Sequence, residues 1–156
     1  MAERFRAAVD GGSRGNPGLA AWGVAVLGPG GRCVEGHAGT LGRATNNVAE
    51  YQALLEALKR AEAAGARDVE IRADSELIVR QVEGRYKVRH PGLVPLHAEA
   101  KRRIGKFRSF RLVHVSREEN READRLVNLA LDRGAKARPD ETVRVLVVPE
   151  PPTSEA

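Results

Sequence analysis

The sequence predicts an α/β fold in which a five-stranded mixed sheet is flanked by helices on both faces. Three apolar runs near the N-terminus are joined by short Gly- and Pro-containing turns, a pattern typical of antiparallel strands. Later apolar runs alternate with helical segments, and such units add parallel strands through right-handed crossovers. With 156 residues and a hydrophobic content of 42%, the chain is long enough for one domain with a buried core.

The predicted strands are bounded by turn residues or by the helices that follow them. The first three precede the first long helix, and the other two follow helical segments. The strands are expected at residues 3–9, 19–27, 32–39, 68–74 and 109–115.

The predicted helices begin at polar capping residues. Asn47 is the expected N-cap of the first helix, which ends before Gly65, and Ser75 is the expected N-cap of a short second helix. A third helix is expected at 96–104. A fourth, at 118–132, has the clearest amphipathic spacing in the chain.

The composition changes after Gly134, so we expect one folded domain at residues 1–134 and a C-terminal tail at 135–156. Within this tail, residues 142–148 are a candidate additional strand. A disordered end is expected from Pro149.

Charge and composition limit the classes of partner. The net charge of +5 favours a polyanionic partner such as nucleic acid, and basic residues concentrate at 80–90 and 101–111. The aromatic content of 4% favours contact with a duplex backbone over stacking on single-stranded bases. Cys33 is the only cysteine, which excludes an internal disulfide and a cysteine-based zinc site. Without a long apolar run or a signal peptide, we expect a cytoplasmic protein with no membrane partner, acting as a monomer.

Four acids are expected to meet at one edge of the sheet. Asp10 and Asp74 end the first and fourth predicted strands, while Glu50 and Asp124 lie near the starts of two helices. Each has a structural alternative, since an acid can cap a helix, favour its dipole or stabilise a turn. Together, however, four carboxylates without a cation would repel one another. Their convergence favours hard divalent ions, and a pair of Mg²⁺ or Mn²⁺ ions suits phosphodiester hydrolysis.

Four motifs accompany these acids. They are Asp10-Gly-Gly-Ser-Arg-Gly-Asn-Pro-Gly, Thr45-Asn-Asn-Val-Ala-Glu-Tyr, Asp74-Ser75 and Arg117-Glu-Glu-Asn-Arg-Glu-Ala-Asp. The glycine-rich motif alone is a common hairpin turn. The ordered set, over about residues 3–132, strongly resembles type I ribonuclease H and so implies an RNase H-like fold.

The resemblance implies roles for individual residues. Asp10, Glu50, Asp74 and Asp124 match the metal-binding set of the family, in which Asp10 would lie between the two ions. Glu50 also matches a contact to a 2′-hydroxyl group. The expected substrate contacts are Asn16 and Thr45 at a DNA phosphate, Gly11, Ser13 and Asn46 along the minor groove, and Ser75.

The activity that the resemblance implies is endonucleolytic cleavage of the RNA strand of RNA–DNA hybrids, leaving 5′-phosphate and 3′-hydroxyl ends. At the loop position where many members carry His, this chain has Arg117, which is expected to hold the scissile phosphate or to assist product release. His114 is expected to be a packing or rim residue, and Arg14 has no assigned role.

Two further departures from the family bear on the substrate. The connection at 84–95 is too short for the basic handle helix of many bacterial members, so substrate grip is expected to shift to Arg85, Lys87 and Arg89. Glu76 replaces a neutral amide, which opens the alternative of a nuclease that also cuts double-stranded RNA. A non-catalytic duplex-binding module is the other alternative.

Overall fold

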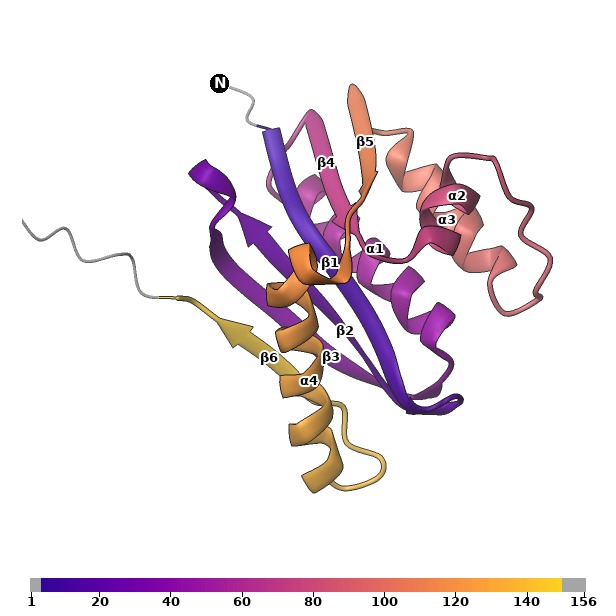
Figure 1. Ribbon diagram of the computed structural model, residues 1–156, viewed down its shortest axis with the longest axis vertical. Coiled ribbons are helices and arrows are strands. Elements are labelled where there is room, and N and C mark those ends of the chain that lie inside the picture. The colour runs from indigo at the N-terminus through magenta and orange to yellow at the C-terminus, as the bar shows by residue number, and fades with distance from the viewer. Residues whose placement is uncertain (1–3, 150–156) are drawn as a thin grey trace, which may run out of the picture.

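The computed structural model describes residues 4–149, which form a single mixed sheet with helices on both faces (Figure 1). The strands are β1 (Arg4–Gly15), β2 (Gly18–Leu27), β3 (Cys33–Ala44), β4 (Asp68–Ala73), β5 (Ser109–His114) and β6 (Arg144–Val147). The helices are α1 (Asn46–Ala63), α2 (Glu76–Val82), α3 (Val94–Ile104) and α4 (Arg121–Lys136), with short 3₁₀ helices η1 (Pro29–Gly31) and η2 (Arg117–Asn120). The strand order is β5-β4-β1-β2-β3-β6, so β1 lies in the interior of the sheet.

The first three strands form the predicted antiparallel meander, but they are longer than the sequence indicated. The prediction that the first strand ends at Asp10 is wrong, because β1 continues to Gly15 in antiparallel pairing with β2. Its parallel pairing with β4 does stop just before Asp10, at the partners Val9 and Ala73. Asp10 therefore still lies at the carboxyl edge of the parallel part of the sheet.

Helix α1 covers one face of the sheet and packs against β1 and β2, with α3 beside it (Figure 1). Its side chains Tyr51, Leu54, Leu55 and Leu58 are almost fully buried in the larger core. The helix starts earlier than predicted, since its N-cap is Thr45, whose Oγ1 accepts a hydrogen bond from the Val48 N–H. Glu50 consequently lies past the first turn and does not cap its own helix.

Helix α4 covers the opposite face and buries a second core against β2 and β3 (Figure 1). Ala123, Leu126, Val127, Ala130 and Leu131 are all buried, as their spacing predicted. The 3₁₀ turn η2 leads into α4 and is closed by a capping box between Ser116 and Glu119. This turn brings the chain from the end of β5 to the beginning of α4.

The sheet has six strands in place of the predicted five. The additional strand, β6, pairs antiparallel with β3 and lies inside the range where a tail strand was a candidate. Most of the expected disordered end lies outside the described residues. Among residues 4–149, no helix is long and apolar enough to cross a membrane.

Candidate active site

Three acids from separate elements meet at the edge where β1 leaves β4. Asp10, Glu50 and Asp74 each offer a carboxylate oxygen, and these oxygens all lie within 4.8 Å of one another. Asp10 is nearly buried, with 8% of its surface exposed, whereas Glu50 and Asp74 are half-buried. The geometry is that of a small cluster of hard oxygen donors open to solvent on one side.

Glu50 reaches Asp10 because α1 packs unusually close to β1. A Cβ atom at Gly11 would lie 2.2 Å from the carbonyl carbon of Ala49, so only glycine allows this approach. The Gly11 N–H then donates a 2.7 Å hydrogen bond to Glu50 Oε1. The glycine after Asp10 thus fixes the direction of the Glu50 carboxylate.

Asp124 approaches from the opposite face of the sheet, on the first turn of α4. The start of α4 is tied to β1 by Asn120, whose Nδ2 donates a 2.8 Å hydrogen bond to the carbonyl oxygen of Val9. Gly23, the partner of Asp10 on β2, leaves room for the Ala123 carbonyl, since a Cβ atom there would lie 2.8 Å from this oxygen. Asp124 itself is exposed and lies outside the three-acid group.

All four predicted acids line one open cleft of about 320 Å³. The other lining residues are Gly11, Gly12, Ser13, Arg14, Asn46, Arg117, Val127, Asn128 and Leu131. Arg117 is therefore in the same cleft as the acids, whereas the lining does not include His114, which is exposed at the end of β5. The sequence reasoning missed Asn128, although its spacing four residues after Asp124 places both on one helical face.

The ionised forms of the clustered carboxyl groups are unfavourable in the cleft when no cation is bound. Burial raises the pKa of Asp10 to about 7, and the carboxylates of Asp74 and Asp124 push it in the same direction. Burial, followed by the charges of Asp10 and Asp74, also raises the pKa of Glu50 well above its usual range. A divalent cation would neutralise this repulsion, so the oxygen-only donor set and its charge both fit Mg²⁺ or Mn²⁺.

The predicted substrate contacts divide between two neighbouring clefts. Gly11 and Ser13 line the acidic cleft, while Asn16 and Thr45 line a second cleft of about 480 Å³. Asn46 lines both clefts. Its Oδ1 accepts the Ser13 N–H at 2.8 Å, and its own N–H donates to Asn16 Oδ1 at 3.0 Å.

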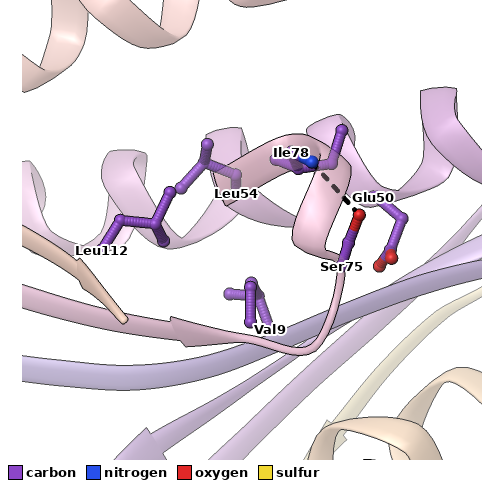
Figure 2. A pocket seen from close by; sticks show the side chains of 7 residues that line it. Val9, Glu50, Leu54, Ser75, Ile78 and Leu112 are labelled. Carbon is purple, nitrogen blue, oxygen red and sulfur yellow. Dashed lines mark hydrogen bonds between the residues drawn. The ribbon is translucent and has the colours of Figure 1, made fainter. Parts of the chain in front are cut away.

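Ser75 has a different environment from the other predicted contacts. Its Oγ accepts the Ile78 N–H at 3.3 Å and so caps α2, as predicted. Figure 2 shows Ser75 and the Glu50 carboxylate at the same end of a crevice that is otherwise apolar. The crevice is too narrow to hold a water molecule. Ser75 is absent from the lining of the acidic cleft.

Arg14, which had no assigned role, also lines the acidic cleft. Its Nη2 lies 2.6 Å from Asp132 Oδ1, so the guanidinium group is paired with α4. Both side chains are well exposed, and such a pair contributes little to stability.

Residues 8–130 match the protein family described as "Reverse transcriptase-like". The chain is 45% identical over 130 residues to a ribonuclease HI of Halobacterium salinarum, covering 83% of this chain and 65% of that protein. It is 42% identical over 147 residues to the bifunctional protein Rv2228c of Mycobacterium tuberculosis, covering 93% of this chain but only 40% of the relative. This chain therefore spans less than two thirds of the length of these relatives.

Solved structures of RNase H proteins are also similar to this chain, and the similarity covers nearly the whole length of each solved chain. The N-terminal RNase H domain of the M. tuberculosis protein has a TM-score of 0.80 and 40% identity, covering 85% of this chain and 96% of that one. RNase H1 of H. salinarum has a TM-score of 0.80 and 41% identity, covering 84% and 99%. LC11-RNase H1, solved in complex with an RNA/DNA hybrid, has a TM-score of 0.79 and 40% identity, covering 84% and 99%. On this combined evidence of sequence, fold and acid placement, the chain belongs to the ribonuclease HI family.

Proposed function

We propose that the protein is an endoribonuclease that hydrolyses the RNA strand of RNA–DNA hybrids and leaves 5′-phosphate and 3′-hydroxyl ends. The observation that carries the proposal is the group of three carboxylates within 4.8 Å, in a cleft that Asp124 also lines. Membership of the ribonuclease HI family supports it. So does the likeness to LC11-RNase H1, whose structure contains an RNA/DNA hybrid.

Two Mg²⁺ or Mn²⁺ ions would be held by the four acids, with Asp10 shared between them. Glu50 and Asp74 would complete one site and Asp124 the other. When bound, such ions lower the pKa of a water nucleophile and stabilise the leaving 3′ oxygen. The protein's own contribution is to hold the carboxylates in place, which the Gly11–Glu50 and Asn120–Val9 hydrogen bonds do.

The remaining residues of the cleft would orient the hybrid. Gly11, Ser13 and Asn46 would contact the minor groove, where one strand displays 2′-hydroxyl groups. Asn16 and Thr45 would hold a phosphate of the DNA strand. Ser75 caps α2 next to Glu50, so it would support the site by positioning α2 more than by contacting the hybrid directly.

Arg117 would contribute charge at the scissile phosphate. A guanidinium group stays protonated, so it cannot act as a base. The side chain lies on η2, close in sequence to Asp124, and lines the acidic cleft. Its proposed role is to hold the scissile phosphate or to assist release of the cleaved strand.

The test is cleavage of a labelled RNA–DNA hybrid by the wild-type protein and by Asp10→Asn, in Mg²⁺ and separately in Mn²⁺. We expect the wild type to cut only the RNA strand and Asp10→Asn to lose roughly a hundredfold or more in kcat. Asp140→Asn is the matched control, because Asp140 is exposed and does not line the cleft. An intact hybrid with the wild type in both metals, or equal cutting by Asp10→Asn, would refute the proposal.

The two alternative functions give different results in the same assay. A non-catalytic module would bind the hybrid without turnover and without a need for metal. A nuclease with relaxed specificity would cut an RNA–RNA duplex of the same sequence. The relaxed-specificity alternative rests on Glu76, whose exposed carboxylate lies 3.7 Å from the Arg80 guanidinium group. Glu76→Gln would test whether this acid affects which duplex is cut.

A further inference from the structure

Strand β6 is the last strand on its side of the sheet, and within residues 4–149 no strand pairs with its outer edge (Figure 1). The Thr40 N–H donates to the Val143 carbonyl oxygen, so the backbone groups of Val143 point toward β3. Because this direction alternates along an antiparallel strand, the N–H and C=O groups of Arg144, Leu146 and Val148 point outward. A row of free backbone groups of this kind can pair with another strand.

The same three residues, here called the β6 stripe, also share one face of the sheet, because alternate side chains of a strand point to the same side. Leu146 and Val148 are the most exposed large apolar side chains among the described residues, at 63% and 68%. Helix α1 does not cover the stripe, since a hollow of about 200 Å³ is lined by Arg60 of α1 on one side and by Arg144 and Leu146 on the other. The free edge therefore carries apolar surface that a partner strand could bury.

Opposite charges lie at the two ends of this surface. Arg144 is exposed, and no carboxylate of residues 4–149 lies within salt-bridge distance of it. Glu35 of β3 has only His37 near its carboxylate, with 3.3 Å between Oε1 and Nε2. Burial, followed by the charge of Arg60, lowers the pKa of His37, so near neutral pH its imidazole does not compensate the Glu35 carboxylate. The surface thus has a free cation near one end and a free anion near the other.

A second copy of the chain complements this edge when the two are related by a two-fold axis at Leu146. In antiparallel pairing about this axis, Leu146 lies opposite the partner's Leu146, and Arg144 lies opposite the partner's Val148. The β3–β6 ladder pairs Gly36 with Val147, so one further step places Glu35 beside Val148. Arg144 is then two strand spacings, roughly 10 Å, from the partner's Glu35. This separation is within the combined reach of the two side chains.

We propose that β6 is a dimer interface through which two copies of the chain join their sheets edge to edge. Leu146 and Val148 of each copy form the apolar centre, and Arg144 pairs with the partner's Glu35 at both ends. This pairing uses every outward N–H and C=O group of the β6 stripe and sets no like charges opposite each other. Because the paired strands are short, the dissociation constant should be on the order of 100 µM. Below about 10 µM the protein would then be the expected monomer.

The dimer would leave both active sites open. Arg144, Leu146 and Val148 line neither the acidic cleft nor the second cleft. Substitutions in the β6 stripe should therefore change assembly without changing hybrid cleavage, and the two properties can be measured separately.

The first experiment measures the mass of the full chain by sedimentation equilibrium between about 5 µM and about 1 mM. The wild type should pass from monomer to dimer over this range. Arg144→Glu and Glu35→Arg should each weaken the dimer about tenfold or more, because each sets like charges against one another. The double variant Arg144→Glu/Glu35→Arg exchanges the two charges, so it should restore the dissociation constant to within about threefold of the wild type. A double variant as weak as the single variants would refute the ion pair and its register.

The matched control is Arg102→Glu, which reverses the same charge at an exposed position of α3, a helix that packs beside α1. It should leave the dissociation constant near that of the wild type. If Arg102→Glu and Arg144→Glu weaken the dimer equally, only the net charge matters and the interface is refuted. Thermal unfolding of each variant at low concentration checks that the fold is intact.

The second experiment locates the two-fold axis. Leu146→Glu places two carboxylates opposite each other, so this variant should stay monomeric up to about 1 mM. Leu146→Cys adds one accessible thiol, since Cys33 is buried. Under mild oxidation in concentrated solution it should form a disulfide-linked dimer about tenfold faster than Arg102→Cys, because the axis brings the two thiols together. Equal cross-linking rates would contradict this placement of the axis.

Two results on the wild-type surface would overturn the proposal outright. One is a wild type that remains monomeric at about 1 mM, and the other is a dimer that persists in Leu146→Glu and so uses another surface. Neither result bears on the proposed hybrid cleavage, which Leu146→Glu should retain at the wild-type rate.

Discussion

At the residue scale, Asp10 occupies a position where its charged form is unfavourable without a cation. Its pKa is raised to about 7 from an ordinary 3.8, first by burial and then by the neighbouring carboxylates. For an acid whose pKa is raised on folding, the native state binds more protons between these two values. The stability of the metal-free protein should therefore fall as the pH rises from about 4 to about 7.

This pH dependence gives a test of Asp10. In a chelating buffer at pH about 8, Asp10→Asn should raise the free energy of unfolding by on the order of 2 kcal/mol, because the amide carries no charge. The gain should shrink toward zero below the unfolded pKa of 3.8, where the wild-type carboxyl group is also neutral. Urea unfolding of both proteins across pH measures the difference.

Metal ions should reverse the order of stability. Added Mg²⁺ binds the native acids and stabilises the wild type, whereas Asp10→Asn should gain little. A constant stability difference across pH, with no response to Mg²⁺, would show that the Asp10 carboxylate is not under electrostatic strain.

At the scale of elements, the site depends on how closely α1 approaches β1. The contact is made at Gly11, where a Cβ atom would lie 2.2 Å from the Ala49 carbonyl carbon and 2.5 Å from the Glu50 nitrogen. Any side chain there must push away the helix that carries Glu50. The hydrogen bond between the Gly11 N–H and the Glu50 carboxylate would be lost with it.

We expect Gly11→Ala to lower the free energy of unfolding by about 1–3 kcal/mol, as overpacking of a close contact does. Gly12→Ala is the matched control, because a Cβ atom at Gly12 meets nothing closer than 3.8 Å. That substitution should change stability by less than about 0.5 kcal/mol. Equal losses in urea unfolding would mean that the two glycines matter for strand conformation and not for the approach of α1.

At the scale of the whole molecule, the sheet separates two cores, and the acids come from both sides of it. Asp10 and Asp74 belong to the sheet, Glu50 to the helix on one face and Asp124 to the helix on the other. The second core extends to β6, whose Val145 is 95% buried, while the adjacent Leu146 is 63% exposed. The residue before β6 is also joined to β3: the Thr40 N–H donates to the Val143 carbonyl oxygen, and the Val143 N–H donates to Thr40 Oγ1, both at 2.9 Å.

The sixth strand should therefore stabilise the fold without taking part in catalysis. Val145→Ala should lower the free energy of unfolding by about 1–3 kcal/mol, because a buried side chain is truncated. Leu146→Ala, on the exposed face of the same strand, should have an effect near zero. Urea midpoints of the two variants measure this, and hybrid cleavage well below the unfolding temperature should match the wild type. A reduced kcat in Val145→Ala would contradict the expectation that β6 contributes to stability and not to catalysis.

Local features of the sequence were sufficient to predict the order of strands and helices and the edge where the acids meet. Alternation of apolar residues marked the strands, and spacing at i, i+3 and i+4 marked α4, because each pattern reflects one buried face. The placement of Asp74 after a strand, and of Asp124 at the start of a helix, also followed from short-range signals. These four acids do line one cleft in the folded chain.

Contacts between segments far apart in the sequence decided the rest. The extension of β1 past Asp10 depends on pairing with β2, and the direction of Glu50 depends on a glycine 39 residues earlier in the chain. The sixth strand depends on antiparallel pairing with β3, more than a hundred residues earlier in the chain for the pair Gly36 and Val147. The second cleft is lined by Thr45 and Asn46 together with Lys87 and Arg89, which are far apart in the sequence. Since these arrangements are stabilised by long-range packing and hydrogen bonds, only the tertiary structure could place them.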